Sequence, residues 1–315
     1  MSEPRIICVS ANPAMDRRLR FATFSKGEVN RAQHAEGFAG GKAAHVAIAA
    51  RSMLAEVSWI GFLGGAIGQE CERQMKTLDL DVIGIQTVAS TRVNLEIIED
   101  SGMVTEILEP GAAPTEQEQE NFFTTIRKVW KGSLLTISGS LPIGLKSQFY
   151  SSVIEEARAQ GAKVFVDTSA EPLRASLSAN ANFIKTNRSE AEDLLGNSVG
   201  TDGAAATACI EFIKRGAGSA AITLGPKGLV WAESKQGPIW SARPPQKKCP
   251  SPVGCGDATM AGFAVAARQG LTGEKAIRLA AACGAANCAA SSPGRIDLAR
   301  VESLVPQIEV RQIYL

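Results

Sequence analysis

An aspartate follows two glycines at the expected start of a helix, in the stretch "CPSPVGCGDAT" (residues 249–259). Gly254 and Gly256 allow a sharp turn and a close approach of backbone N–H groups to a ligand. Amides at a helix N-terminus bind anions, and a carboxylate beside a bound phosphoryl group can take the proton of an attacking hydroxyl. Asp257 can equally be a first-turn aspartate that interacts favourably with the helix dipole. Local chemistry leaves both interpretations of Asp257 open.

A second glycine-rich segment, "EGFAGGKAAHVAIAARSML" (36–54), also leads into an expected helix. Gly40 and Gly41 permit close backbone approach, and Lys42 stands at the helix start, where a cation opposes the helix dipole. An anionic substrate would explain Lys42, whereas a solvated surface lysine needs no ligand. His45 would share the face of Lys42, and a structural role is the simpler interpretation of a lone histidine.

Further polar residues follow expected strands. Asp16 ends "ANPAMD", directly after the first strand, and is either a ligand-binding carboxylate or an ordinary turn residue. Asn187 and Glu190 fit a helix-capping pair, and they equally fit a water-mediated Mg²⁺ site beside phosphates. The small-residue turn "ISGSLPIG" (137–144) could pass close to a ligand, and "ITLGPKGLVWA" (222–232) is typical of a hairpin.

Short apolar segments that suit β-strands alternate with segments of helical pattern along the chain. The expected strands are 5–10, 56–64, 133–139, 162–167, 182–186 and 219–225. The expected helices are 42–53, 68–78, 115–130, 146–160, 188–195, 203–215, 256–269 and 273–290. Several strands are apolar throughout, as strands buried on both faces of a parallel sheet are. The alternation predicts an α/β fold with a mostly parallel, helix-covered sheet and a ligand site at the carboxyl ends of its strands.

Residues 17–38 and 82–109 interrupt this pattern by alternating polar and apolar side chains. The second segment predicts a hairpin that turns near Asp100–Gly102. Both segments together predict a small antiparallel sheet inserted into the α/β body, either as an excursion without function or as a lid over the strand ends. No Pro-, Gly- or Ser-rich linker divides the chain, so residues 1–315 are expected to form a single domain.

The composition limits the classes of partner. The chain has 315 residues, 45% of them hydrophobic and 21% charged, with a net charge of +1. These values are ordinary for a globular protein and give no reason to expect nucleic acid or a membrane surface as partner. Aromatic residues make up only 5%, which argues against a base-stacking surface. No apolar stretch is long enough to span a bilayer.

Seven cysteines occur without a Cys-x-x-Cys pair, mostly in apolar or small-residue segments. This pattern predicts reduced thiols of a cytoplasmic protein, not a disulfide framework or a zinc site. Only His34 and His45 could supply imidazole ligands, which excludes a histidine-based metal site. The N-terminal "MSEPRIICVSANPAMD" lacks a basic region followed by a long apolar one, so it is not expected to be a signal peptide.

Several well-known motifs are missing. No G-x-x-x-x-G-K-[ST] phosphate loop is present. The segment "GFAGGK" does not match this motif, because its glycine spacing differs and no Ser or Thr follows the lysine. No G-x-G-x-x-G dinucleotide fingerprint follows the first strand, and no G-x-S-x-G nucleophile motif occurs. The remaining motifs share one order along the chain.

That order resembles the ribokinase-like carbohydrate kinases, the phosphofructokinase-B family, from "NPAMD" to "SSPGRID". "VGCGDATMAGF" resembles the family's Gly-Ala-Gly-Asp signature, and "AGGKAAHVA" resembles its Gly-Gly-Lys-Gly-x-Asn-Val-Ala signature. "GEVNRA", "TRVNLEI", "TEILEPG", "SGSLPIG" and "TLGPKG" resemble the branch that phosphorylates sugar phosphates, which includes 1-phosphofructokinases and tagatose-6-phosphate kinases.

The resemblance implies a ribokinase-like three-layer fold, with the inserted strands as a β lid that can also form a homodimer contact. It implies ATP and Mg²⁺ as cofactors and Asp257 as the base for the attacking sugar hydroxyl. The backbone groups implied as the anion hole for the γ-phosphate are those of Gly254, Cys255 and Gly256. Residues implied to contact the sugar or its phosphate are Asp16, Gly40, Gly41, Lys42, His45, Arg92, Asn94 and Ser140.

Within that set, Lys42 and Arg92 would bind the phosphate that the substrate already carries. Residues implied to bind ATP are Lys185, Asn187, Glu190, Thr223, Gly225, Gly228, Gly256 and Asn287. Asn187 and Glu190 would also order Mg²⁺ through water, and the small residues from Ala285 to Cys288 would pack on adenine.

The chain departs from the family pattern at four positions. Ala43 stands where the signature has glycine, which would reduce the freedom of that loop. His45 stands where the family commonly has a sugar-binding asparagine, so substrate choice or affinity would change. Thr186 replaces a proline, and Cys255 replaces an alanine whose role depends on its amide.

The implied reaction is the ATP-dependent phosphorylation of a hexose phosphate. Fructose 1-phosphate, giving fructose 1,6-bisphosphate, is the favoured substrate, and tagatose 6-phosphate, giving tagatose 1,6-bisphosphate, is the close second. The alternatives are a kinase of a free sugar or nucleoside, which His45 makes more plausible, and a sugar-phosphate-binding homologue without catalysis.

Overall fold

One sheet of ten strands runs through the middle of the part of the chain that the structure describes. The computed structural model covers residues 5–246 and 249–315, so the first four residues of the segment judged unlike a signal peptide lie outside it. The sheet order is β14-β13-β12-β11-β10-β9-β8-β1-β4-β5. The strands that run parallel are β1 (Ile6–Ser10), β4 (Val57–Gly64), β5 (Asp81–Thr87), β8 (Leu134–Ser138), β9 (Lys163–Asp167), β10 (Phe183–Asn187) and β11 (Ser219–Thr223). The antiparallel strands at one edge are β12 (Leu229–Ala232), β13 (Ile239–Arg243) and β14 (Glu309–Ile313).

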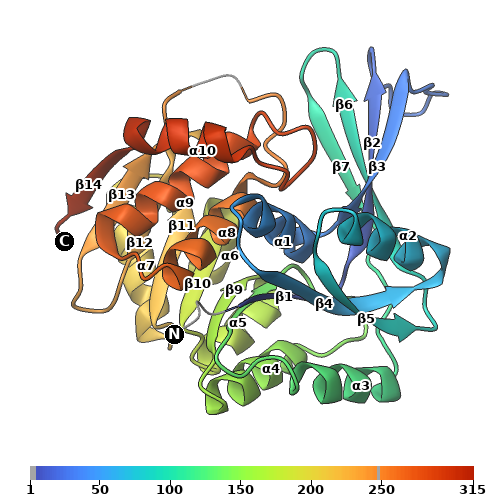
Figure 1. Ribbon diagram of the computed structural model, residues 1–315. Helices are drawn as coiled ribbons and strands as arrows, with labels where there is room; N and C mark the ends of the chain where they lie inside the picture. Colours follow the sequence, from blue (N-terminus) through green and yellow to red (C-terminus); the bar gives the residue numbers. More distant parts are fainter. Residues whose placement is uncertain (1–4, 247–248) are drawn as a thin grey trace.

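Helices cover both faces of this sheet and make a three-layer molecule (Figure 1). The helices whose buried residues join one apolar cluster are α1 (Lys42–Ser52), α2 (Gly65–Lys76), α8 (Cys255–Arg268), α9 (Gly273–Asn287) and α10 (Leu298–Leu304). The helices that contribute to the cluster on the opposite face are α3 (Glu116–Ile126), α4 (Gln148–Ala159), α5 (Ala170–Ser178), α6 (Arg188–Leu195) and α7 (Asp202–Lys214). Because central strands such as β1 and β8 are buried along their whole length, both faces must be covered. The expected α/β class is confirmed.

A second sheet of four strands projects from the body, at the upper right of Figure 1. Its strands, in sheet order, are β3 (His34–Gly40), β2 (Ala14–Phe21), β6 (Arg92–Glu99) and β7 (Val104–Leu108). The pairs β2–β3 and β6–β7 are antiparallel, whereas β2 and β6 join them in parallel register. We call these four strands the lid.

The bounds of the lid differ from those expected from the sequence. The expected segment 82–109 included residues that form β5, and β5 pairs with β4 at the edge of the central sheet. The expected turn near Asp100–Gly102 is present, with Gly102 at φ 86°. The sequence pattern assigned β5 to the lid because β5 alternates polar and apolar residues. An edge strand of the central sheet is exposed on one side, as a lid strand is, so both show this alternation.

A buried ion pair within the lid also contacts the body. Arg18 of β2 and Glu96 of β6 lie 2.8 Å apart, with side chains only 6% and 7% exposed. Arg18 also donates to the carbonyl of Ser291, and the hydroxyl of Ser251 donates to the other oxygen of Glu96. Buried charges need such partners, since an unpaired one is costly. The lid is therefore held against two loops of the C-terminal half of the chain.

Candidate active site

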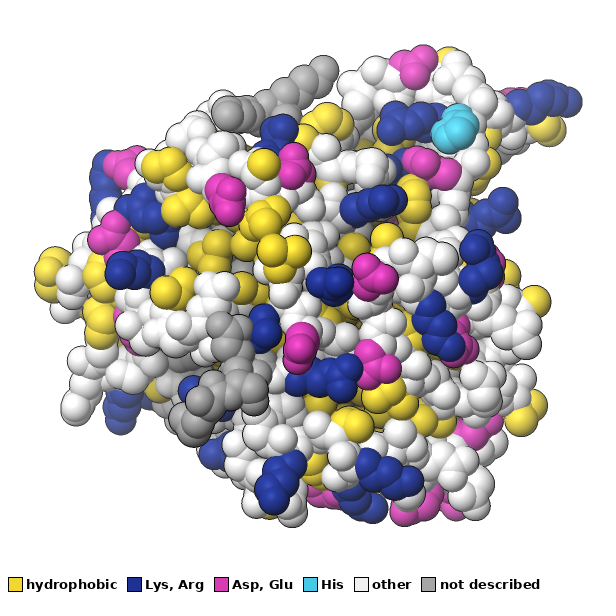
Figure 2. Space-filling view, in the orientation of Figure 1, with side chains coloured by type: hydrophobic (Ala, Val, Ile, Leu, Met, Phe, Trp, Pro, Cys, Tyr) yellow, Lys and Arg dark blue, Asp and Glu magenta, His cyan; other side chains and the backbone are white. Residues whose placement is uncertain are grey.

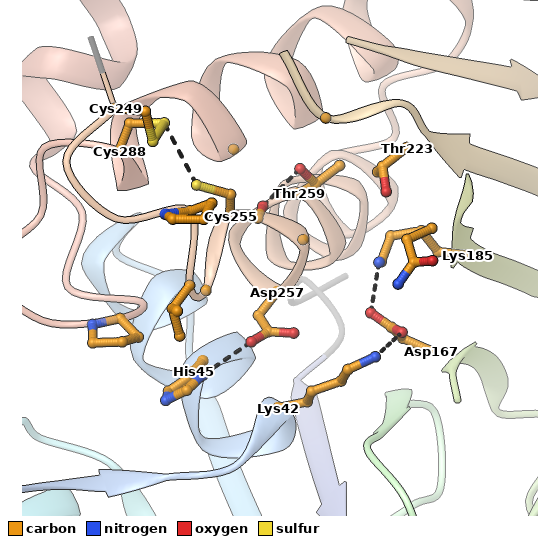
Figure 3. Close-up of a pocket in the computed structure, with 18 of the residues that line it drawn as sticks. Lys42, His45, Asp167, Lys185, Thr223, Cys249, Cys255, Asp257, Thr259 and Cys288 are labelled. Carbon is orange, nitrogen blue, oxygen red and sulfur yellow. Dashed lines mark hydrogen bonds and ion pairs between the residues drawn. A yellow bond between two sulfur atoms is a disulfide. The ribbon is translucent and has the colours of Figure 1, made fainter. Parts of the chain in front are cut away.

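A cavity of about 1110 Å³ lies between the lid and the carboxyl ends of the central strands. It receives side chains from the ends of β9, β10 and β11, from the starts of α1 and α8, and from the lid strands β2 and β6. This is the edge at which parallel α/β sheets bind ligands. Figure 3 shows Asp257 pointing from α8 into the space between His45 and Lys42.

The start of α8 presents free backbone donors beside Asp257. Gly254 is the N-cap with φ 81°, and an added Cβ there would lie 2.8 Å from Cβ of Pro293, so only glycine suits the turn. The amide of Cys255 donates to the carbonyl of Pro252 at 3.1 Å. Among the described residues, the amides of Gly254, Gly256 and Asp257 have no partner.

The amides of residues 254–257 were expected to form an anion site, and the family resemblance implied those of Gly254, Cys255 and Gly256; this role stays a prediction. The amide of Cys255 is occupied by the carbonyl of Pro252. The amide of Asp257 is free because it lies in the first turn of α8, where amides have no helical acceptor. The side chain of Cys255 reaches towards sulfur and amide groups outside this turn.

His45 lies between two carboxylates. Its Nδ1 is 2.9 Å from Oδ2 of Asp257, and its Nε2 is 3.0 Å from Oδ2 of Asp16. The side chain is 5% exposed, so this ring is enclosed. Burial disfavours a charged ring, but the hydrogen bonds and negative charges of Asp16 and Asp257 outweigh it and raise the pKa of His45 to about 10. The ring is an imidazolium at neutral pH.

Asp16 is held from several directions. It lies in β2 of the lid, not directly at the end of β1 as the sequence indicated. Asn94 donates to its Oδ1 at 2.8 Å, and the amide of Gly41 donates to its Oδ2 at 3.3 Å. Burial would raise the pKa of Asp16, but His45, Asn94 and Gly41 hold that pKa below its usual value. An added Cβ on Gly40 would lie 2.2 Å from the carboxyl carbon of Asp16, so Gly40 makes room for this carboxylate.

Arg92 is fixed at the lid end of the cavity. Its guanidinium donates to the carbonyls of Asn12 and Glu109 and to Oδ1 of Asn94. Asn12, which the sequence reading missed, also donates to the hydroxyl of Ser140 at 3.3 Å. No carboxylate forms an ion pair with Arg92 in the described part of the chain, so its charge faces the cavity without a counterion.

Two lysines meet one buried aspartate on the opposite side of the cavity. Lys42 lies 2.9 Å from Oδ1 of Asp167 and 3.2 Å from Glu190, and Lys185 lies 2.6 Å from Oδ2 of Asp167. Asp167 is fully buried, and its two lysines overcome the effect of burial and hold its pKa below the usual value. Burial would lower the pKa of Lys42, but the negative charges of Asp167, Glu190 and Asp257 outweigh it and raise that pKa.

The ammonium of Lys42 contacts Asp167 and Glu190. The expected role of Lys42, which is to bind the phosphate of the sugar substrate together with Arg92, stays a prediction. Asp167 was not predicted as a site residue. Its signal in the sequence is its position as the last residue of the apolar stretch "AKVFVD", at the carboxyl end of a strand.

Asn187 and Glu190 form a capping box at the start of α6. Oδ1 of Asn187 accepts from the amide of Glu190 at 2.9 Å, and Oε2 of Glu190 accepts from the amide of Asn187 at 2.8 Å. The capping interpretation is therefore confirmed. Both side chains also line the cavity, so a second role beside phosphates remains compatible with this cap.

The residues Thr223, Gly225 and Gly228, which were expected to bind ATP, line the cavity, as do Ala285 and Cys288. Their role in binding a nucleotide stays a prediction. Thr223 donates to the carbonyl of Thr186 at 3.3 Å, which joins the ends of β10 and β11.

Asn287 is placed differently from the prediction. It is 3% exposed and does not line the cavity. Its amide donates to the carbonyl of Val253 and its oxygen accepts from the amide of Gly294. Asn287 therefore joins the loops that contain Val253 and Gly294. Gly40, which was expected to contact the sugar, does not line the cavity either.

A disulfide joins Cys249 to Cys288 across 39 residues, and this corrects the expectation of reduced thiols throughout. Cys255 is free, with its sulfur 3.6 Å from that of Cys288. The other free thiols, those of Cys8, Cys71, Cys209 and Cys283, are buried. The sequence did not indicate this pair, because Cys249 lies in a loop and Cys288 at the end of α9. Their spacing in the chain gives no sign that the fold brings them together.

Charged side chains of both signs are mixed over the face drawn in Figure 2. Within the described ranges, no helix combines the length and the apolar character that crossing a bilayer requires. Of the predicted site residues, those lining the cavity are Asp16, Gly41, Lys42, His45, Arg92, Asn94, Ser140, Lys185, Asn187, Glu190, Thr223, Gly225, Gly228, Gly254, Cys255, Gly256 and Asp257.

Several known proteins are similar to this chain over nearly its full length. A 1-phosphofructokinase of Vibrio cholerae is 28% identical over 312 residues, which are 98% of this chain and 98% of that protein. A tagatose-6-phosphate kinase of Staphylococcus epidermidis is 30% identical over 312 residues, which are 98% of this chain and 100% of that protein. Phosphofructokinase-2 of Escherichia coli, solved in complex with substrates and products, has a TM-score of 0.89 and 25% identity, covering 96% of this chain and 98% of that one.

The family model for pfkB family carbohydrate kinases matches residues 6–298, from the first strand to the start of α10. The match includes both glycine-rich helix starts, Asp257 and the four lid strands. The chain therefore belongs to the pfkB family of carbohydrate kinases.

Proposed function

We propose that this kinase transfers the γ-phosphate of ATP to the free primary hydroxyl of a ketohexose monophosphate. Fructose 1-phosphate, giving fructose 1,6-bisphosphate, is the preferred substrate, and tagatose 6-phosphate, giving tagatose 1,6-bisphosphate, is the second. The names of the two relatives support this pair of substrates. The cytoplasm, where ATP and sugar phosphates occur together, is the proposed compartment.

The observation that carries the proposal is the unpaired guanidinium of Arg92. Backbone carbonyls and Asn94 fix its orientation, while its charge faces the cavity. A guanidinium that is always charged and fixed in orientation suits an ionic contact with a phosphate, for which one N–H of Nη2 is still free. A substrate that carries a phosphate would supply the missing counterion, whereas an uncharged sugar or nucleoside would leave Arg92 unpaired.

Asp257 is the proposed base. Its Oδ2 contacts His45, and its Oδ1 has no partner among the described residues. Oδ1 would accept the proton of the sugar hydroxyl as that oxygen bonds to the γ-phosphorus and the bond to the β–γ bridging oxygen breaks, which releases ADP. The products are the sugar bisphosphate, ADP and one proton, which Asp257 later gives to solvent.

Free amides and lysines would balance the charge of the transferring group. The amides of Gly254, Gly256 and Asp257 lie at the start of α8, where donors and the helix dipole favour an anion. Lys42 lies beyond Asp257, next to Glu190, and its ammonium would approach the γ-phosphate from the opposite side. Preorganised donors of this kind supply much of the rate enhancement of phosphoryl transfer.

Mg²⁺ fits the donor chemistry of this region. Glu190 and Asn187 provide oxygen donors that face the cavity, but their hydrogen bonds to amides and to Lys42 occupy most lone pairs. Mg²⁺ keeps several waters and prefers phosphate and a few carboxylate oxygens, so contact through water suits these residues. The ion would neutralise charge on the ATP phosphates.

The experiment is an assay of ATP consumption over a substrate panel. The panel contains fructose 1-phosphate, tagatose 6-phosphate, fructose 6-phosphate, fructose, ribose and adenosine. The proposal expects the highest kcat/KM for fructose 1-phosphate. Higher values for an uncharged sugar or a nucleoside would contradict it, and no ATP consumption with any of them would favour a homologue without catalysis.

A matched pair of variants tests the role of Arg92. Arg92→Gln should raise KM for the sugar phosphate about ten- to hundredfold, the effect of losing a hydrogen bond to a charged group, with little change in KM for ATP. Arg17→Gln removes an exposed arginine from the same lid sheet and should change neither KM. Equal effects of the two variants would contradict the role of Arg92 in binding the sugar phosphate.

A further inference from the structure

We propose that His45 is a positioning residue. Its ring bridges Asp257, the proposed base, and Asp16, the proposed sugar-binding carboxylate, and holds the two side chains in one fixed arrangement. The inference deepens the proposed function and rests on it for the roles of the two aspartates. The three side chains come from three elements: Asp16 from β2 of the lid, His45 from α1 and Asp257 from α8.

The first contact selects one oxygen of Asp257. Nδ1 of His45 lies 2.9 Å from Oδ2, a hydrogen-bond distance, and Figure 3 shows the ring beside this carboxylate. With Oδ2 held, rotation of the carboxylate is restricted and Oδ1 stays directed at the cavity. A base whose accepting oxygen is already aligned saves the cost of ordering it during the reaction.

The second contact connects the ring to the lid. Nε2 of His45 lies 3.0 Å from Oδ2 of Asp16, and Asn94 and Gly41 hold the same carboxylate. The backbone of His45 packs closely on Gly294, because an added Cβ on Gly294 would lie 2.5 Å from the carbonyl oxygen of His45. The ring therefore transmits the position of a lid residue to a residue of the body.

Charge explains why this unit holds together. Two carboxylates that approach a common point repel each other in a buried site, and one of them would otherwise favour protonation. The imidazolium between them offsets that repulsion, and Glu106 of β7 is a further acidic group whose charge acts on the ring. A neutral asparagine at this position would supply donors but no charge.

Two conservative replacements separate the two contacts. The amide nitrogen of asparagine is as many bonds from Cα as Nδ1 of histidine, and that of glutamine is as many as Nε2. His45→Asn therefore keeps a donor for Asp257 and loses Asp16, whereas His45→Gln keeps a donor for Asp16 and loses Asp257. His45→Phe removes both donors and retains a ring.

Steady-state kinetics with ATP and fructose 1-phosphate are the first readout. His45→Asn should raise KM for the sugar phosphate about tenfold with little loss of kcat, because the buried ion pair of the ring with Asp16 is lost on the sugar side. His45→Gln should lower kcat about tenfold or more with a smaller change of KM, because the base loses its alignment. His45→Phe should show both effects.

Nitrogen-15 NMR gives a readout that needs no activity. The chain has only two histidines, so His34→Gln assigns the ring signals of His45. Both ring nitrogens of His45 should show the cationic pattern from about pH 6 to about pH 9. Fructose 1-phosphate should shift these signals more than ATP alone, because Asp16 faces the sugar end of the cavity.

Three results would overturn the inference. The first is a neutral ring at about pH 7. The second is that His45→Asn and His45→Gln change kcat and KM in the same way. The third is that these variants lose thermal stability while their kinetics stay unchanged. If the wild-type chain phosphorylated no sugar phosphate while the NMR pattern held, the proposed function would fail and the charged unit would remain.

Discussion

Lys42 and Asp167 form an ion pair of 2.9 Å between the first residue of α1 and the last residue of β9. The pair brings together residues that are 125 positions apart in the chain. Asp167 is fully buried, and Lys185 contacts its other oxygen at 2.6 Å, so Lys185 neutralises this carboxylate even without Lys42. The charge of Lys42 is therefore available for a phosphate in the cavity.

Replacement of Lys42 tests this availability. Lys42→Met should lower kcat about a hundred- to a thousandfold, the loss measured for one preorganised donor to transition-state charge. The fold should survive, because Asp167 keeps Lys185. Steady-state kinetics and circular dichroism measure the two effects, with Lys146→Met, an exposed lysine before α4, as the control. A rise in KM for the sugar phosphate without a fall in kcat would return Lys42 to the role that the sequence indicated.

The charge of His45 predicts a pH-dependent stability. Its pKa in the folded chain is about 10, raised from 6.5, so the stabilisation is complete below about pH 6.5, declines above it, and is lost as the pH passes about 10. The difference in free energy of unfolding between wild type and His45→Asn should therefore shrink as pH rises. Urea titrations at several pH values measure it, and a difference that is constant with pH would argue against an imidazolium.

The disulfide between Cys249 and Cys288 predicts a defined thiol count. Denatured, unreduced protein should label at five cysteines with iodoacetamide, and reduction should expose the remaining pair. Mass spectrometry counts the labels. Seven labels without reduction would show that the pair is reduced.

Loss of this disulfide should lower stability. For a separation of 39 residues, the chain-entropy account gives about 4 kcal/mol as the free energy of unfolding that the bond contributes. Cys249→Ser should therefore unfold at lower urea concentration than wild type under oxidising conditions. A reductant should remove the difference, and a difference that persists would show that the serine itself disturbs the loop.

Exposed apolar residues on β7 predict a homodimer through the lid. Ile107 and Leu108 are 47% and 60% exposed on β7, one of the two edge strands of the lid sheet, where unpaired backbone groups can accept another strand. Leu108→Asp should convert dimer to monomer in sedimentation experiments. Tyr314→Asp, at the opposite end of the molecule, should not, and a wild-type monomer would exclude the lid contact.

Much of the fold could be predicted because its strands are short apolar stretches and its helices are amphipathic. The expected segments 5–10 and 188–195 became β1 and α6 with almost the same bounds. Helix α5 follows β9 directly and contains Pro172, so its pattern was too short to recognise. Strands β13 and β14 pair over a distance of many residues, and such pairing leaves no local signal.

The position of a site residue could be predicted where it follows from a motif, whereas the direction of its side chain could not. Asp257 follows its glycines into the cavity, as expected. Lys42 opens its helix as expected, but rotates towards Asp167, which no spacing rule connects to it. Ala43 is compatible with its position because it lies inside α1 and needs no glycine conformation.

The most direct test of the account is the turnover of Asp257→Asn with ATP and fructose 1-phosphate, measured beside its affinity for ATP by calorimetry. Asparagine keeps the volume of the side chain and loses the basic oxygen. The account predicts a fall in kcat of about a hundred- to ten-thousandfold, with ATP affinity largely unchanged. Near-normal turnover of this variant would contradict the role of Asp257 as the base.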